Sequence, residues 1–198
     1  VHAENIIHAE SLEDSKQSGK AIFSAVERMS HLVNQLLRLN RLDSLDKSTD
    51  FSDIELKTLV SAAINSLPTN RVGNYQWQVD VPTTKIACNE TLIISALTNL
   101  LSNAMKFSPA DSTIQIEAVD TSASIIIKIR DQGSGVPAEI IEQMGERFYR
   151  FREHTNIAGS GLGLSITSKI IQLHHGKLSF NNIQPSGFEV QIELPNSD

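Results

Sequence analysis

The 198-residue sequence has little of several things that whole functional classes need. Its single cysteine, Cys88, excludes an intramolecular disulfide framework and a cysteine-rich zinc site, and it suits a reducing compartment. Aromatic residues make up only 5% of the chain, which argues against base-stacking or carbohydrate-binding platforms. No apolar run reaches the roughly 18 residues of a membrane-spanning helix. We therefore expect a soluble chain that does not insert into a membrane.

Positive charge is also scarce. Lys and Arg total 17 against 23 Asp and Glu, which gives a formal net charge of −6. Non-specific nucleic-acid binding needs an excess of cations to neutralise phosphates, so no nucleic-acid partner is expected. A local anion site remains compatible with this balance. The 40% hydrophobic content is enough to build a core and argues against a disordered chain.

Glycine is nearly absent from the first two thirds of the chain and concentrated in the last third. Only two glycines precede Gly133, whereas six of the ten lie between Gly133 and Gly163. The front instead has apolar residues at the 4-3-4-3 spacing of a coiled-coil seam: Ile22, Val26, Met29, Val33 and Leu36. We expect a helix that pairs with a partner chain, in a helical hairpin truncated at its N-terminal end; the alternative is a surface helix that lies on its own domain. Polar residues 11–18 are expected to break the hairpin, and residues 44–52 to form a hinge.

The back half reads as a mixture of strands and helices. Strands are predicted at 75–81, 113–119, 124–130, 177–181 and 188–194, and helices at 56–67, 90–107, 138–144 and 162–174. Because hairpins mix with single helices, an α+β two-layer sandwich is favoured over a doubly wound parallel sheet. The predicted domains are residues 1–46, a partial helical hairpin, and residues 47–198.

Four segments carry candidate chemistry. In the helix 90–107, Asn99, Asn103 and Lys106 lie on the side opposite the apolar stripe. Such a face can simply be solvated. Alternatively, an amide oxygen can complete a Mg²⁺ shell that also contains phosphate oxygens, and a lysine one turn on can neutralise a phosphate.

The second segment, Asp131-Gln132-Gly133-Ser134-Gly135-Val136, directly follows a β-branched strand. It can be an ordinary turn. In a functional reading, Asp131 accepts a hydrogen bond from an exocyclic amine, and the glycines let a flat base approach the backbone. A carboxylate there favours adenine over guanine, since guanine has an acceptor at its 6-position.

The third segment, Gly159-Ser160-Gly161-Leu162-Gly163-Leu164, opens an apolar helix. Backbone N–H groups at such a start can converge on an anion. It is neither a Walker loop nor the dinucleotide fingerprint. A fourth segment, residues 146–152, lies between the second and the third and includes three arginines and an aromatic pair. It is compatible with a lid or with a solvated loop anchored by Phe148 in the core.

Taken in their order along the chain, the four segments resemble the N, G1, F and G2 boxes of sensor histidine kinases. The ATP-binding domain of these kinases belongs to the gyrase, Hsp90, histidine kinase and MutL ATPase group. The stretch 99–108 is similar to the N box, and residues 32–37 and 42–44 are similar to the second helix of the dimerisation hairpin. The resemblance implies a Bergerat-type ATP-binding fold in residues 47–198.

The resemblance also implies roles for individual positions. Asn103 would ligate Mg²⁺, Lys106 would contact phosphate, and Asp131 would hold the adenine amine. The implied ATP-binding positions are Asn99, Asn103, Lys106, Phe107, Asp131, Gly133, Gly135, Val136, Phe148, Tyr149, Arg150, Gly159, Ser160, Gly161, Leu162, Gly163 and Leu164. The implied cofactors are ATP and Mg²⁺.

The family's phosphoacceptor pattern, His-Glu-x-x-[Ser/Thr]-Pro, does not occur in this sequence. We therefore expect the acceptor upstream of Val1, in a longer protein of the bacterial inner membrane with this region in the cytoplasm. The implied activity is transfer of the γ-phosphoryl group of Mg·ATP to that histidine and then to a response-regulator aspartate. A response-regulator receiver domain and a second copy of the hairpin are the implied partners. Alternatives are an ATPase or serine kinase of the same fold, and a non-catalytic nucleotide-binding dimerisation module.

Overall fold

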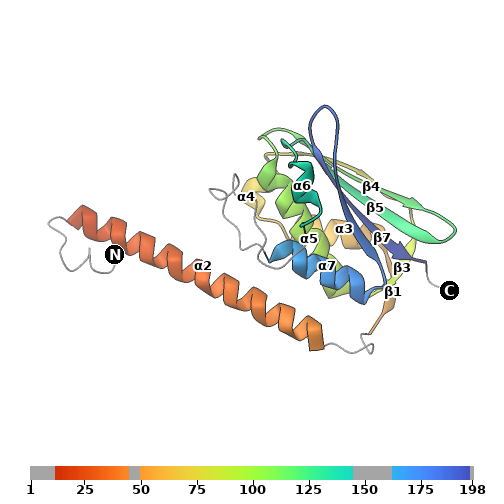
Figure 1. Cartoon of the computed structure of the whole chain (residues 1–198), viewed down its shortest axis with the longest axis horizontal. Coiled ribbons are helices and arrows are strands. Elements are labelled where there is room, and N and C mark those ends of the chain that lie inside the picture. Colours follow the sequence, from red (N-terminus) through yellow and green to blue (C-terminus); the bar gives the residue numbers. More distant parts are fainter. Residues whose placement is uncertain (1–11, 45–49, 145–161, 197–198) are drawn as a thin grey trace. The chain divides into compact units, whose positions relative to one another are not determined.

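The computed structural model describes residues 12–44, 50–144 and 162–196 (Figure 1). The chain divides into two compact units, residues 1–41 and 42–198. Helix α2 (Leu12–Ser44) forms the described part of the first unit, and its last three residues belong to the second. The polar break expected at 11–18 is wrong, because α2 already runs through residues 12–18. Leu, Glu, Lys and Gln in that stretch are good helix formers despite their polarity. The segment 1–10, expected as the other part of the hairpin, lies outside the described residues.

Helix α2 leaves its apolar seam exposed. Met29 is 65% exposed, Val26 54% and Val33 52%, and all three belong to the seam predicted from the spacing. Pairing with a second copy of the chain remains a prediction. Across the part of the chain that the structure describes, no helix combines the length and the apolar character needed to cross a membrane.

The second unit is a sheet with helices on one face, which confirms the predicted α+β sandwich (Figure 1). The strand order is β2-β4-β5-β7-β6. These strands are β2 (Gln76–Asp80), β4 (Thr113–Asp120), β5 (Ser124–Asp131), β7 (Phe188–Pro195) and β6 (Lys177–Asn182). Only the β2–β4 pair is parallel. The helices α3 (Leu56–Asn65), α5 (Glu90–Phe107) and α7 (Gly163–Leu173) cover one face of this sheet.

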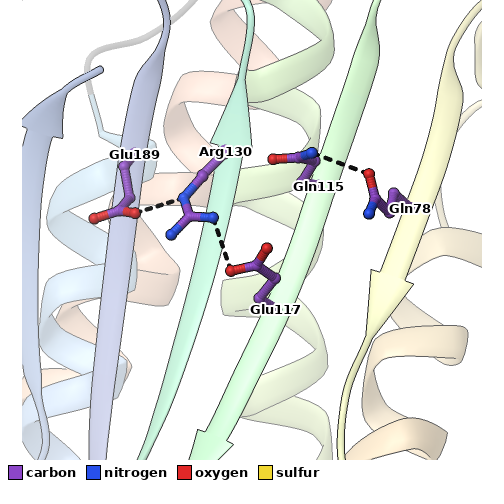
Figure 2. Close-up of polar contacts among 5 residues, drawn as sticks. All are labelled: Gln78, Gln115, Glu117, Arg130 and Glu189. Carbon is purple, nitrogen blue, oxygen red and sulfur yellow. Dashed lines mark hydrogen bonds and ion pairs between the residues drawn. The ribbon is translucent and has the colours of Figure 1, made fainter. Parts of the chain in front are cut away.

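Alternation along the strands separates the core from the open face of the sheet. In β5, Ile125, Ile127 and Ile129 are buried beneath the helices, whereas the side chain of Arg130 points the other way. Arg130 donates to Glu189 through Nε and to Glu117 through Nη1, each at 2.7 Å (Figure 2). On the open face, polar side chains of neighbouring strands therefore bond to one another. The helices α3, α5 and α7 lie on the other face.

The sequence missed three short elements: β1 (Ser52–Glu55), β3 (Lys85–Cys88) and α4 (Thr69–Val72). Strands β1 and β3 pair only with each other, and four residues carry too little periodicity to be recognised. Helix α6 (Ala138–Ile141) is shorter than the predicted 138–144. None of its residues is buried, so no apolar packing extends it.

A buried histidine joins the end of α7 to the start of α5. His174 is 3% exposed; its Nδ1 donates to the Ile170 carbonyl at 2.7 Å, and its Nε2 accepts from the Asn89 N–H at 3.1 Å. Phe51 stacks on the ring at 4.7 Å between centroids. Because Nε2 must accept, this arrangement requires the neutral imidazole. Burial lowers the pKa of His174 below its usual 6.5.

This histidine makes the stability of the second unit depend on pH. With its pKa lowered in the folded state, the contribution of His174 is complete above pH 6.5 and is lost as the pH falls toward the folded-state pKa. In urea titrations between pH 7.5 and 5, we expect a loss of unfolding free energy that the His174→Gln variant lacks. His175→Gln, an exposed neighbour whose charge adds to the lowering of the His174 pKa, should retain most of this pH dependence. Equal pH profiles for the unsubstituted chain and His174→Gln would contradict it.

Candidate functional site

The last residue of β5, Asp131, is a carboxylate held in an apolar environment. It is 9% exposed, and its Oδ1 accepts from the Gly133 N–H at 2.7 Å. Burial raises the pKa of Asp131 from 3.8 to about 6, although backbone hydrogen bonds with Gly133 and Phe188 partly offset that shift. At neutral pH the group is an ionised acceptor kept from water, which is unfavourable for folding and typical of a functional site.

Gly133 brings the end of α5 against this carboxylate. A Cβ at this position would lie 2.8 Å from the Phe107 carbonyl oxygen and 2.9 Å from Asp131 Oδ1. Both separations are too short for a carbon atom, so only glycine permits the approach. The predicted site residues Phe107, Asp131 and Gly133 are therefore neighbours in space.

The loop that follows is anchored by a residue that the sequence analysis missed. Gly135 has φ +71°, which favours glycine. The Val136 N–H donates to Asn182 Oδ1 at 2.9 Å, and Asn182 Nδ2 donates to the Val136 carbonyl at 2.7 Å. Asn182 ends β6, and no sequence signal distinguished it from an ordinary turn residue.

Asn99 lies between two helices rather than on a solvated face. Its Nδ2 donates to Thr167 Oγ1 at 2.8 Å, and Thr167 is fully buried. A Cβ at Gly163 would lie 2.5 Å from Asn99 Oδ1. The first turn of α7 therefore packs directly against the amide, which ties the predicted N-box helix to the start of α7.

Asn103 and Lys106 follow Asn99 along α5, one and two turns toward its C-terminal end. Both side chains are half-buried. Lys106 Nζ lies 4.9 Å from the centroid of the Phe107 ring. The spacing of four and three residues keeps these side chains on one side of the helix, continuous with the Phe107–Gly133 contact.

The remaining predicted positions divide between described and undescribed parts of the chain. Leu162 is fully buried, so its side chain belongs to the core, while Gly163 begins α7 and Leu164 is half-buried. Six predicted positions lie outside the described residues: Phe148, Tyr149, Arg150, Gly159, Ser160 and Gly161.

The donor set fits magnesium bound through phosphates. Within residues 12–44, 50–144 and 162–196, no group of three or more His, Cys, Asp or Glu side chains could hold a metal ion. Mg²⁺ in nucleotide sites keeps waters and takes one or two protein oxygens plus phosphate oxygens. The partly exposed amide of Asn103 suits the role of a single protein ligand of this kind.

The family comparison agrees with this geometry. Residues 88–198 match the family described as histidine kinase-, DNA gyrase B- and HSP90-like ATPase. Sensor protein QseC of Escherichia coli K12 is 37% identical over 177 residues, covering 86% of this chain and 38% of QseC. The chain thus spans about two fifths of the length of this relative. The residues of segments 42–46 and 145–150 resemble those of QseC-type kinases, and this match agrees with that resemblance.

Solved structures extend the similarity to the fold. The mycobacterial sensor histidine kinase MprB superposes with a TM-score of 0.68 at 25% identity, covering 73% of this chain and 97% of that structure. Full-length ShkA, solved in complex with AMPPNP, has a TM-score of 0.76 at 20% identity and covers 95% of this chain and 40% of that structure. With more than half of its length matching the family, this chain belongs to the histidine kinase-, DNA gyrase B- and HSP90-like ATPases, and its relatives are sensor histidine kinases.

Proposed function

We propose that this chain binds Mg·ATP and is the catalytic ATP-binding region of a sensor histidine kinase. The observation that carries the proposal is the buried carboxylate of Asp131 beside the Gly133 turn and the end of α5. A protein keeps an ionised carboxylate out of water at a cost in stability, and a specific donor on a ligand explains why it is retained.

Each described residue of the site has a definite task in this proposal. Asp131 accepts a hydrogen bond from the adenine 6-amino group, and this selects against guanine, which presents a carbonyl there. Lys106 places positive charge near the phosphates. Asn103 supplies one oxygen ligand to Mg²⁺, which when bound neutralises phosphate charge. Asn99 aligns α7 with α5 and so sets the backbone that approaches the phosphates.

The proposed reaction is transfer of the γ-phosphoryl group to a histidine nitrogen, and from there to a response-regulator aspartate. Phosphoryl transfer depends on positioning and charge neutralisation, so the ATP-binding unit needs no nucleophile of its own. In our proposal the acceptor histidine precedes Val1, α2 pairs with a second copy, and the parent protein is anchored in the inner membrane. The similarity of this chain to sensor kinases favours this reaction over an ATPase or serine kinase of the same fold.

Calorimetric titration of the 198-residue chain with Mg·ATP and with Mg·GTP tests the proposal. Saturable binding of ATP without comparable binding of GTP is the expected result. If the folded chain binds neither nucleotide, the motifs are only a scaffold, and the chain is a dimerisation module with a vestigial pocket. Equal binding of both nucleotides would contradict the role of Asp131.

Asn103→Ala tests the phosphate end of the site separately. Loss of the amide ligand should weaken Mg·ATP binding about tenfold or more, since a hydrogen-bonding or ligating group to a charged centre contributes roughly 1.5–3 kcal/mol. Adenosine, which has no phosphates, should bind as well as before. Calorimetry with both ligands measures the difference, and Ser102→Ala, an exposed neighbour on α5, is the matched control. An equal loss for adenosine would contradict the assignment.

A further inference from the structure

The end of β6 lies beside the candidate adenine site although it is far from it in sequence. The register aligns Asp131 of β5 with Phe188 of β7, and Phe188 in turn with Asn182 of β6. These three residues form one row across the sheet. Because β7 begins at Phe188, the chain leaving Asp131 can cross over the start of β7 and reach the end of β6 five residues later.

At that point the Asn182 amide holds the backbone of Val136 from both sides. Its Oδ1 accepts from the Val136 N–H at 2.9 Å and its Nδ2 donates to the Val136 carbonyl at 2.7 Å. One side chain thus reproduces the paired hydrogen bonds of an antiparallel strand neighbour. Two hydrogen bonds of this kind restrict both backbone dihedral angles of Val136, φ and ψ.

The contact also determines the conformation of the residue before Val136. A Cβ at Gly135 would lie 2.5 Å from Asn182 Oδ1, and Gly135 has φ +71°. The amide therefore packs directly on the glycine that turns the loop. The segment 132–136 is held at one end by Asp131 in the sheet and at the other by Asn182.

The turn between β6 and β7 packs against the same row of residues. Ile183 N–H donates to the Gly187 carbonyl at 3.0 Å, and a Cβ at Gly187 would lie 2.6 Å from the Asp131 carbonyl oxygen. The β6–β7 hairpin is thus packed against the backbone of the very residue that carries the carboxylate. The β6–β7 hairpin therefore contacts both ends of the 131–136 segment, at Asp131 and at Val136.

We infer that Asn182 is a positioning residue for adenine recognition: through its paired hydrogen bonds to Val136 it holds the 132–136 loop in the shape that receives the base. This inference rests on the proposed function. Asn182 needs no contact with the nucleotide in order to act, because its effect passes through Gly135 and Val136 to the pocket.

Substitution of Asn182 should weaken binding at the adenine end alone. We expect Asn182→Ala to lower the affinity about tenfold for ATP and for adenosine alike, because the effect does not involve the phosphates. Asn182→Asp should bind still more weakly, since a carboxylate oxygen then faces the Val136 carbonyl. Asn181→Ala, an exposed position on the opposite face of β6, is the matched control and should bind as the unsubstituted chain does.

Two further measurements separate positioning from a general loss of structure. Hydrogen exchange of the Val136 amide should accelerate at least tenfold in Asn182→Ala, while the core amides of β5 and the melting temperature stay unchanged. Gly135→Ala should cost less affinity in the Asn182→Ala background than in the unsubstituted chain, because the conflict of the new methyl group with Asn182 Oδ1 has been removed.

The outcomes are distinguishable. If the unsubstituted chain binds ATP and adenosine but Asn182→Ala binds them equally well, Asn182 has no positioning role and the inference is overturned. A loss confined to ATP would overturn it too, because it would place the effect at the phosphates. If the unsubstituted chain binds neither ligand, the proposed function fails first and the inference fails with it.

Discussion

Asp131→Asn is expected to abolish adenine binding and at the same time to stabilise the fold. The variant keeps an oxygen that can accept from the Gly133 N–H, but its Nδ2 and its lack of charge make it a poor partner for the adenine amine. We expect the affinity for ATP to fall at least a hundredfold in calorimetry. The unfolding free energy at pH 7.5 should rise by about 1–3 kcal/mol, because a buried charge is removed.

The direction of the pKa shift determines how the stability gain of Asp131→Asn varies with pH. Since the pKa of Asp131 is raised from 3.8 to about 6 in the fold, its stabilising contribution is complete below pH 3.8 and is lost as the pH rises through 6. The advantage of Asp131→Asn in urea unfolding should therefore be largest above pH 7 and shrink toward pH 4. Asp80→Asn, an exposed carboxylate on β2, is the control. A destabilised Asp131→Asn at pH 7.5 would show that the Gly133 hydrogen bond outweighs desolvation.

Gly133→Ala should also weaken binding, but it should lower the stability of the fold instead of raising it. The new methyl group would lie 2.8 Å from the Phe107 carbonyl oxygen and 2.9 Å from Asp131 Oδ1, so the turn must move away from α5. Overpacking of this kind typically costs about 1–3 kcal/mol of unfolding free energy. We expect at least a tenfold loss of affinity for adenosine as well as for ATP.

Gly73→Ala is the matched control for this substitution. A Cβ at Gly73 would have no atom within 4 Å, so stability and binding should both stay close to those of the unsubstituted chain. Chemical denaturation and calorimetry on the two variants measure the contrast. Unchanged adenosine binding by Gly133→Ala would show that the contact between the turn and α5 does not shape the pocket.

The sequence alone determined the long elements and the family of this protein. The bounds of α5 were predicted at both ends because an apolar stripe, the acidic first turn and Pro109 agree locally. The strand β5 was predicted because β-branched residues precede Asp131, and the order of the polar motifs identified the ATPase family. These features depend on neighbours within a few residues.

Only the tertiary structure decided which side chains surround the site. The sequence allowed a solvated face for Asn99. The packing of α7 against α5 instead places its amide between Gly163 and Thr167. Asn182 carried no local signal, because its contact with Val136 depends on the strand order β5-β7-β6 and on the register of both pairs. Local sequence specifies periodicity and turns, whereas contacts between residues 46 or 68 positions apart arise only when the sheet and its helices pack.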